Sequence, residues 1–264
     1  MNFHNIIGQE EVIGMLRKAV SEDRVGHAYI FTGPAGIGKR TIAHEFAGLL
    51  LCAQPGEQGA CGKCLPCLMY KKDSNPDYMK IKTEEASIGV DAIREVQADV
   101  VIKPRYSSRK VYVIEDADKM TDQAQNCLLK TFEEPPDYVV VILTASNYER
   151  LLDTIKSRAR RINFKRYTDE QVLKAVTEKL GYTPEQARIA VEYSDGNIGT
   201  ALELCGSEKF KALRDNVFEI AWKAACGKTD SIMQLVSLFE ENKDRADLIL
   251  DIMLHYFRDI LVML

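Results

Sequence analysis

A glycine-rich loop places the strongest constraint on the fold of this chain. Residues 33–39 read Gly-Pro-Ala-Gly-Ile-Gly-Lys and fit the pattern G-x-x-x-x-G-K. An apolar run at residues 27–31 precedes the loop, and a helical pattern follows from Thr41 to Cys52. In the order strand, loop, helix, this pattern cradles phosphates with backbone N–H groups, a helix N-terminus and the lysine. The sequence therefore predicts a nucleotide-type loop with the candidate residues Gly33, Gly36, Gly38 and Lys39.

Further apolar runs predict a parallel sheet around this loop. Residues 110–114 and 138–143 are β-branched apolar runs, and residues 78–81 form a shorter candidate strand. Continuous rather than alternating hydrophobicity indicates strands covered on both faces, and intervening helices indicate parallel pairing. Ligands of such sheets gather at the carboxyl ends of the strands. Only helical patterns follow Phe164, so we expect the second half of the chain to be all helix.

Residues beside the loop depart from those of an efficient ATPase. Arg40 follows Lys39, where Ser or Thr would supply a hydroxyl to Mg²⁺. Thr41 is a weaker candidate, because one further helical position turns its side chain by about 100°. Glu115-Asp116 reverses the Asp-then-Glu order expected after the strand, and displacing a water-orienting group by about 1 Å can cost about 10²-fold in rate. We expect poor hydrolysis and disfavoured Mg²⁺, with ATP or ADP binding open; a polar strand end capping the next helix is the alternative for the carboxylates.

Four of the seven cysteines crowd into one short segment. Cys52, Cys61, Cys64 and Cys67 have the spacing C-x8-C-x2-C-x2-C. Four thiolates on a tight loop can complete a tetrahedral Zn²⁺ shell, and none of the four histidines lies in this segment. The pattern therefore favours structural over catalytic zinc, with a redox C-x-x-C pair or an iron–sulfur cluster as alternatives.

Charge and hydropathy disfavour two broad classes. The 35 Lys and Arg against 39 Asp and Glu leave a formal charge of −4, which is unlike a strongly basic, autonomous nucleic-acid binder. The N-terminus lacks the basic and apolar regions of a secretory signal. The most apolar stretch, residues 246–264, carries several charges that would be costly in lipid. We therefore expect a cytoplasmic protein with no membrane partner.

Several strings together point to one family. They are Gly8-Gln9, residues 27–31, residues 128–136 (Leu-Leu-Lys-Thr-Phe-Glu-Glu-Pro-Pro) and Ser157-Arg158. Together they resemble the bacterial clamp-loader subunits of DNA polymerase III, an AAA+ family, and residues 128–136 are the most specific. The resemblance implies a P-loop α/β domain at 1–165 with a zinc-binding insert at 52–67, a helical lid at 166–206 and an all-helical, partial collar at 207–264.

Within this family, the chain is similar to the delta-prime branch rather than to the ATPase branch. Both branches share the four-cysteine insert, whereas residues 76–78 and 88–96 and the altered phosphate loop are similar to delta-prime. The turn at residues 196–202 also lacks the arginine that senses nucleotide in the ATPase subunits. The resemblance therefore implies a non-catalytic or weakly hydrolysing subunit with an impaired ATP site.

The resemblance also implies a role for Arg158 in trans. In related subunits a Ser-Arg-Cys motif places the arginine in the ATP site of the neighbouring subunit, and here Ala159 replaces the cysteine. A guanidinium can stabilise charge on a transferring phosphoryl group. The alternative is a solvated basic edge made with Lys156, Arg160 and Arg161.

The implied partners are those of a clamp loader. They are the ATPase and delta subunits, the sliding clamp and primer–template DNA. As a mostly rigid scaffold, this chain would help to load the sliding clamp on the primed DNA. DNA phosphates could touch a basic loop, for which a solvated surface is the alternative; its residues are Lys103, Arg105, Arg109 and Lys110. The rival functions are an autonomous ATPase that uses Lys39, Glu115 and Asp116, and a zinc-dependent nucleic-acid module.

Overall fold

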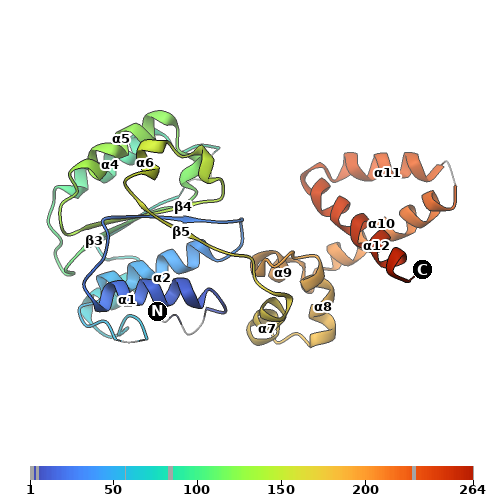
Figure 1. Ribbon diagram of the computed structural model, residues 1–264, viewed down its shortest axis with the longest axis horizontal. Coiled ribbons are helices and arrows are strands. Elements are labelled where there is room, and N and C mark those ends of the chain that lie inside the picture. Colours follow the sequence, from blue (N-terminus) through green and yellow to red (C-terminus); the bar gives the residue numbers. More distant parts are fainter. Residues whose placement is uncertain (1–2, 4–5, 57, 83–85, 228–229, 264) are drawn as a thin grey trace. The chain divides into compact units, whose positions relative to one another are not determined.

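The chain divides into two compact units, residues 1–166 and residues 167–264. The computed structural model describes residues 3, 6–56, 58–82, 86–227 and 230–263. The first unit is a sheet covered by helices, and the described part of the second unit is helical, as Figure 1 shows. The predicted α/β domain followed by helices is therefore confirmed.

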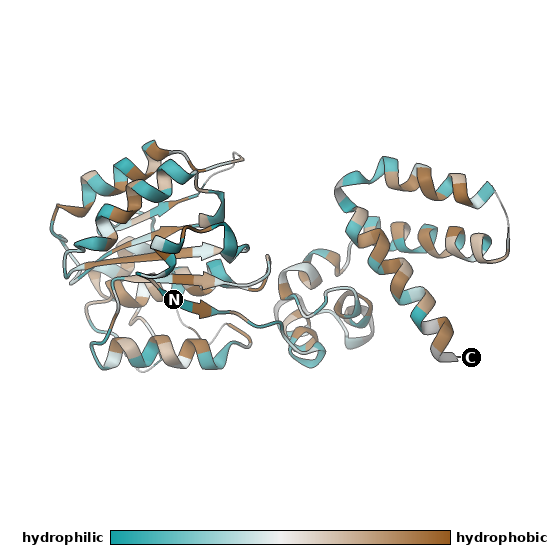
Figure 2. Cartoon of the chain, turned by 45° about the horizontal axis from the view of Figure 1, so that its top comes forward, coloured by the Kyte–Doolittle hydropathy of each residue, from teal (hydrophilic) through white to brown (hydrophobic). Residues whose placement is uncertain are grey.

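The first unit is built on a five-stranded parallel sheet with the strand order β2-β3-β4-β1-β5. The strands are β1 (Ala28–Thr32), β2 (Tyr78–Ile81), β3 (Lys110–Ile114), β4 (Val139–Ala145) and β5 (Arg160–Asn163). Every residue of β1, β3 and β4 is buried, and most of these strands are brown in Figure 2. Their uninterrupted apolar runs match strands that are covered on both faces.

Helices cover both faces of this sheet. One face carries α1 (Glu10–Ser21) and α2 (Lys39–Leu51), and the other carries α4 (Val90–Val100), α5 (Asp122–Glu133) and α6 (Asp153–Lys156), as Figure 1 shows. The short helix α3 (Leu65–Lys71) packs against α2. The helix α1 illustrates the pattern, because its buried side chains Val12, Ile13, Leu16 and Ala19 follow helical spacing.

The strand β5 was absent from the sequence-based expectation. It pairs with β1 in register from Tyr29 and Arg160 to Thr32 and Asn163. Only Ile162 of its four residues is buried, because β5 lies at the edge of the sheet. A short edge strand with two arginines lacks the apolar run that marked the buried strands.

The second unit contains two groups of helices in sequence. α7 (Asp169–Leu180), α8 (Pro184–Glu192) and α9 (Ile198–Leu204) contact one another, and α10 (Glu208–Ala225) packs against α11 (Asp230–Glu241) and α12 (Ala246–Met263). Thr168 and Gln171 form a capping box that begins α7. The predicted border between lid and collar at residue 206 stays a prediction.

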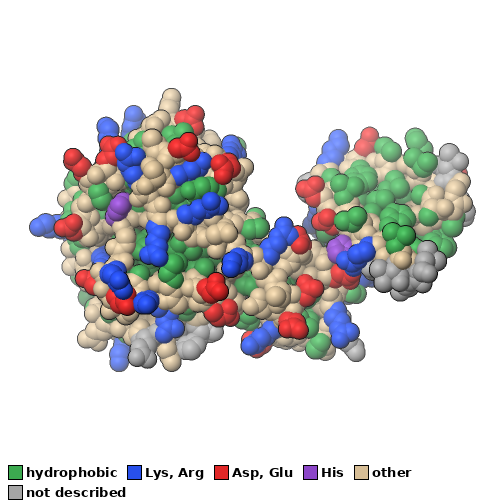
Figure 3. All heavy atoms as spheres, viewed as in Figure 1, with side chains coloured by type: hydrophobic (Ala, Val, Ile, Leu, Met, Phe, Trp, Pro, Cys, Tyr) green, Lys and Arg blue, Asp and Glu red, His purple; other side chains and the backbone are tan. Residues whose placement is uncertain are grey.

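The C-terminal helices expose a large apolar surface. Figure 3 shows hydrophobic side chains gathered over this region. Those more than one third exposed on α11 and α12 are Ile232, Met233, Val236, Leu250, Leu254, Phe257 and Leu261. Among the described residues, no helix is both long and apolar enough to traverse a bilayer. Exposed apolar side chains gathered in one region mark a candidate surface for contact with another protein.

Gly33 is required by packing, which gives a direct test of the fold. Its φ is +148°, and a Cβ there would lie 2.8 Å from the backbone oxygen of Phe164. We expect Gly33→Ala to lower the free energy of unfolding by about 1–3 kcal/mol, measured as a lower urea midpoint. Gly14→Ala is the control, because this exposed site inside α1 has open space and alanine should add about 0.5–1 kcal/mol of stability. An unchanged midpoint for Gly33→Ala would contradict the packing argument.

Candidate functional site

The phosphate loop joins the end of β1 to the start of α2. Gly36 and Gly38 have φ values of +74° and +90°, in the left-handed region that favours glycine. α2 begins at Lys39, and its N-cap, Gly38, offers no side-chain acceptor. The first N–H groups of a helix have no partner within the helix and carry the positive end of its dipole. The loop therefore has the local structure of an anion site.

Lys39 lies inside this loop. Its side chain is buried, and Nζ donates to the backbone oxygens of Gly33 and Pro34 at 2.6 Å and to Ser146 Oγ at 3.2 Å. Burial lowers the pKa of the Lys39 ammonium from its ordinary value, and Asp118 and Asp116 oppose this shift. Since three neutral oxygens already accept from Nζ, binding of a phosphate at this lysine requires exchange of some of these contacts.

Arg40 occupies the space between the two carboxylates that follow β3. Its Nη2 lies 2.5 Å from Asp116 Oδ2, and its Nε lies 3.5 Å from Glu115 Oε2. Asp116 has a left-handed backbone conformation, with φ of 51° and ψ of 50°, which aspartate tolerates better than most residues. The carboxylates that would serve a metal therefore bind a guanidinium.

Glu115 is held from its other side by a chain of aromatic residues. His44 Nε2 lies 2.7 Å from Glu115 Oε1, and Tyr78 Oη lies 2.7 Å from His44 Nδ1. Tyr70 Oη donates to the backbone oxygen of His44 at 2.9 Å. Burial raises the pKa of both phenols, which keeps them protonated as donors. Sequence reasoning missed His44, Tyr70 and Tyr78, since no short motif connects them.

Five of the candidate nucleotide residues line one cavity of about 270 Å³: Gly36, Gly38, Lys39, Thr41 and Asp116; Gly33 and Glu115 are not among its lining residues. Lys39, Arg40, Thr41, Asp116 and Ser146 are among its lining residues. This volume lies just below the usual range of about 300–1,000 Å³ for small-molecule sites. Ser146, at the end of β4, was not assigned by the sequence, although polar residues at a parallel strand end were a usable signal. Magnesium does not fit, because its expected carboxylates bind Arg40 and its expected hydroxyl is absent.

The four cysteines of the insert come together in space. Their sulfur atoms all lie within 4.8 Å of one another, and Cys52 Sγ and Cys64 Sγ are 4.0 Å apart. Zn–S bonds of about 2.3 Å in a tetrahedron place sulfurs about 3.8 Å apart. Backbone N–H groups of Cys61 and Cys64 donate to the sulfurs of Cys52 and Cys61. The donor set therefore fits zinc in number, type and spacing.

The thiols of this cluster differ in acidity. Backbone N–H groups of Lys63 and Cys64 lower the pKa of Cys61 to about 6. Burial raises the pKa values of Cys52 and Cys67. A bound cation deprotonates coordinating thiols outright, so binding of zinc would release protons from the cluster.

Arg158 lies far from the phosphate loop of its own chain. It lies two residues before β5, whereas the loop directly follows β1, and the two strands are parallel with Tyr29 opposite Arg160. The four residue steps from Tyr29 to Gly33 span about 13 Å along the strand. Arg158 Nη2 lies 3.2 Å from Glu133 Oε1, and its side chain is 37% exposed. Arg158 therefore lies near the amino ends of β1 and β5, whereas the phosphate loop lies at the carboxyl end of β1, and its guanidinium is partly exposed to solvent.

The neighbouring cations are more constrained than Arg158. Lys156 lies over the ring of Tyr148, 5.1 Å from its centroid, and pairs with Glu149 and Asp153. Arg161 stacks on the same ring at 3.9 Å and donates to Thr32 Oγ1. Arg160 is exposed, as Arg158 is, so the solvated basic edge stays an alternative.

Two of the four basic residues in the loop at and before the start of β3 pair with carboxylates, and the other two are exposed. Lys110 is buried and lies 2.8 Å from Asp99 Oδ1, and Arg109 pairs with Asp23 at 2.6 Å. The expectation that Lys110 touches phosphate is therefore corrected, since its side chain is buried against a carboxylate, whereas Arg109 is paired with an exposed one. Lys103 and Arg105 are exposed.

The backbone of this loop is held by one buried carboxylate. Asp77 accepts from the N–H groups of Arg105, Tyr106 and Ser107 at 2.6 to 2.8 Å. Because these bonds fix the backbone, they present the Arg105 side chain from a defined position.

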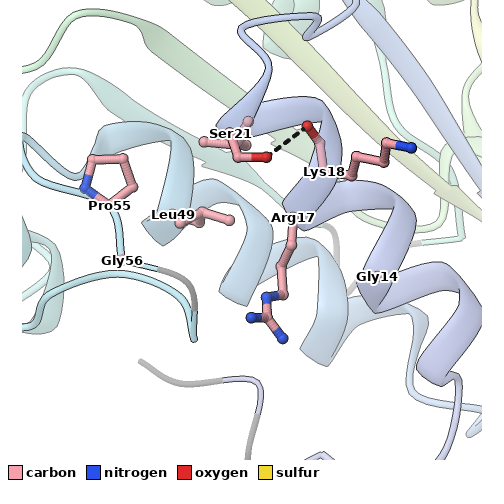
Figure 4. Close-up of a pocket in the computed structure, with 8 residues that line it drawn as sticks. Gly14, Arg17, Lys18, Ser21, Leu49, Pro55 and Gly56 are labelled. Atoms are coloured by element: carbon pink, nitrogen blue, oxygen red, sulfur yellow. Dashed lines mark hydrogen bonds between the residues drawn. The ribbon is translucent and has the colours of Figure 1, made fainter.

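A larger groove of about 640 Å³ lies between α1 and the end of α2, away from the phosphate loop. Figure 4 shows Arg17 and Lys18 beside it, with Ser21 Oγ bonded to the backbone oxygen of Lys18. Its lining also includes Leu49, Pro55 and Gly56. Among the described residues that line it, none is a carboxylate, histidine or cysteine.

Comparison with solved structures supports the same fold. A RuvB variant from Thermotoga maritima aligns over 90% of this chain and 71% of its own, with a TM-score of 0.52 and 14% identity. Identity this low indicates a shared fold alone. The chain therefore shares the fold of that protein, a parallel-sheet unit with a phosphate loop followed by helices.

Sequence comparisons identify the family. The family model described as "DNA polymerase III, delta subunit" matches residues 8–168. "DNA polymerase III subunit delta'" of Pseudomonas aeruginosa is 44% identical over 50% of this chain and 41% of its own length. The Bacillus subtilis protein of the same name is 29% identical over 96% of this chain and 77% of its own. The chain spans half or less of several other curated relatives. This chain therefore belongs to the DNA polymerase III delta subunit family, in its delta-prime clamp-loader branch.

Proposed function

We propose that this chain is a mostly rigid subunit of a clamp loader that supplies Arg158 to the ATP site of a neighbouring ATPase subunit. The observation that supports the proposal is the position of Arg158. It lies near the amino ends of β1 and β5, whereas the phosphate loop of the same chain lies at the carboxyl end of β1. From there the guanidinium cannot serve the nucleotide of its own chain, and its exposure leaves it accessible to a neighbour. An arginine supplied in trans stabilises charge on the transferring phosphoryl group.

The site of this chain is itself impaired under this proposal. Arg40 binds Glu115 and Asp116, so neither carboxylate is free to hold a metal or to orient water. We infer that the chain alone is non-catalytic, or hydrolyses ATP weakly. The rival function, an autonomous ATPase, needs both carboxylates in the roles that the arginine blocks.

The cysteine cluster holds structural zinc in this proposal. Four thiols supply the complete tetrahedral shell; Cys52, Cys61 and Cys64 lie between the end of α2 and the start of α3, and Cys67 lies on α3. Closed sites with four protein ligands are structural rather than catalytic. Zinc therefore ties the end of α2 to α3.

The proposed partners are other clamp-loader subunits, the sliding clamp and primer–template DNA. The exposed apolar face of α11 and α12 supports contact with another protein. Lys103 and Arg105 are the residues of the basic loop that remain available for DNA phosphate, an interaction that would weaken with salt.

Reconstitution tests the proposal against its rival. We expect this chain alone to show no ATP turnover above that of its Lys39→Ala variant, and the complex lacking this chain to load clamps only after it is added. Steady-state phosphate release and a clamp-loading assay measure the two results. Turnover by the isolated chain that Lys39→Ala abolishes would favour the autonomous ATPase.

A further inference from the structure

The arginine beside the phosphate loop stands where a magnesium-dependent site needs a metal ligand. Both oxygens of Glu115 are engaged, Oε1 by His44 at 2.7 Å and Oε2 by Arg40 at 3.5 Å. Asp116 binds the same guanidinium and lies 3.6 Å from Lys119 Nζ. Magnesium demands near-octahedral oxygen ligands at about 2.0–2.1 Å and gives up its waters reluctantly. A magnesium ion here would find both carboxylates already bound, and it would be repelled by the guanidinium of Arg40.

The same arginine supplies what a phosphate chain requires. A guanidinium stays charged, and its planar array of donors matches phosphate oxygens in a bidentate way. Arg40 lines the cavity together with Lys39, and its side chain is 56% exposed, so it can bind a ligand while keeping one carboxylate contact. With the helix N-terminus of α2, these two cations supply positive charge for a phosphate without a metal, once Lys39 Nζ exchanges some of its present contacts.

We propose that Arg40 replaces the magnesium ion, so that the loop binds a diphosphate group, such as that of a nucleoside diphosphate, in its metal-free form. Asp116 lines the same cavity as an anion. A phosphate next to Asp116 therefore experiences repulsion that no metal ion offsets. The inference concerns only the loop of this chain and holds or fails independently of the role of Arg158.

Nucleotide titrations of the full chain test the proposal. Fluorescently labelled ADP is titrated with EDTA and then with excess MgCl₂, and unlabelled ADP and pyrophosphate serve as competitors. For the wild type we expect labelled ADP to bind at least about tenfold tighter in EDTA than in excess MgCl₂, because Mg²⁺ binds ADP and lowers the concentration of metal-free ADP. For Arg40→Thr, we expect affinity in EDTA to fall about tenfold, and Mg²⁺ to strengthen binding instead. Arg94→Ala is the control, since that arginine is exposed on α4, away from the phosphate loop, and pairs with Asp91.

The competitors distinguish the source of the diphosphate. Displacement by pyrophosphate indicates that the diphosphate alone is recognised, and displacement by ADP only indicates a nucleoside diphosphate. The proposal is overturned if wild-type binding requires Mg²⁺, if no binding occurs in EDTA, or if Arg40→Thr leaves the response to Mg²⁺ unchanged. A circular dichroism spectrum equal to that of the wild type shows that the exposed substitution leaves the fold intact.

Discussion

Replacing Arg158 with alanine should lower ATP hydrolysis at the neighbouring subunit's site by about 10³-fold, the lower end of the effect of an arginine supplied in trans. The physical reason is the loss of a fixed positive charge beside the transferring phosphoryl group. In single-turnover hydrolysis by the assembled complex, one site per complex should become slow while the other sites keep their rate.

The design separates catalysis from assembly. Arg158 is 37% exposed and pairs with Glu133, and Arg94 is likewise exposed and pairs with Asp91. Arg94→Ala therefore removes an arginine of similar setting and should leave every site unchanged. Arg158→Lys should restore only part of the rate, because an ammonium lacks the planar fork of donors. An assembled Arg158→Ala complex that hydrolyses ATP at the wild-type rate would show that the role in trans is wrong.

Loss of zinc should give the second large effect. We expect one zinc ion per chain by elemental analysis, and none in the double variant Cys61→Ser, Cys64→Ser. A ligand at about 1,000 times its dissociation constant stabilises the folded state by about 4 kcal/mol. For a domain of about 150–250 residues this corresponds to a fall in Tm of about 8–16 °C. Thermal unfolding followed by circular dichroism measures the shift.

A matched cysteine provides the control for zinc. Cys226 is an exposed thiol outside the cluster, so Cys226→Ser should keep both the zinc content and the Tm. A chelator should reproduce the fall in Tm for the wild type and leave the double variant unaffected. Freshly purified wild-type protein without bound metal would contradict the assignment.

The sequence alone predicted the parts of the fold that depend on local pattern. The buried strands β1, β3 and β4 are continuous apolar runs, and the phosphate loop has a spacing that few other structures use. The edge strand β5 was missed, because Arg160 and Arg161 are exposed and the strand is defined by its pairing with β1. Pairing partners lie more than a hundred residues apart, beyond any local signal.

In the candidate sites, too, the sequence predicted features of local spacing and missed contacts between distant segments. The four cysteines could be named from their spacing, because ligands on one short loop are close by construction. The arginine after Lys39 could be recognised as a departure, but its contacts with Glu115 and Asp116 could not, since they join α2 to the end of β3. The same holds for Lys110, whose charge suggested a phosphate contact and whose side chain is buried against Asp99.

The sequence by itself determined the phosphate loop, the buried strands, the cysteine cluster and the family, because each is recorded in residues close together along the chain. The tertiary structure decided which charges are available. It places the guanidinium of Arg40 between two carboxylates. It leaves that of Arg158 near the amino ends of β1 and β5, paired with one exposed glutamate. A charge acts according to its neighbours in space, and only the packing of the helices on the sheet brings those neighbours together.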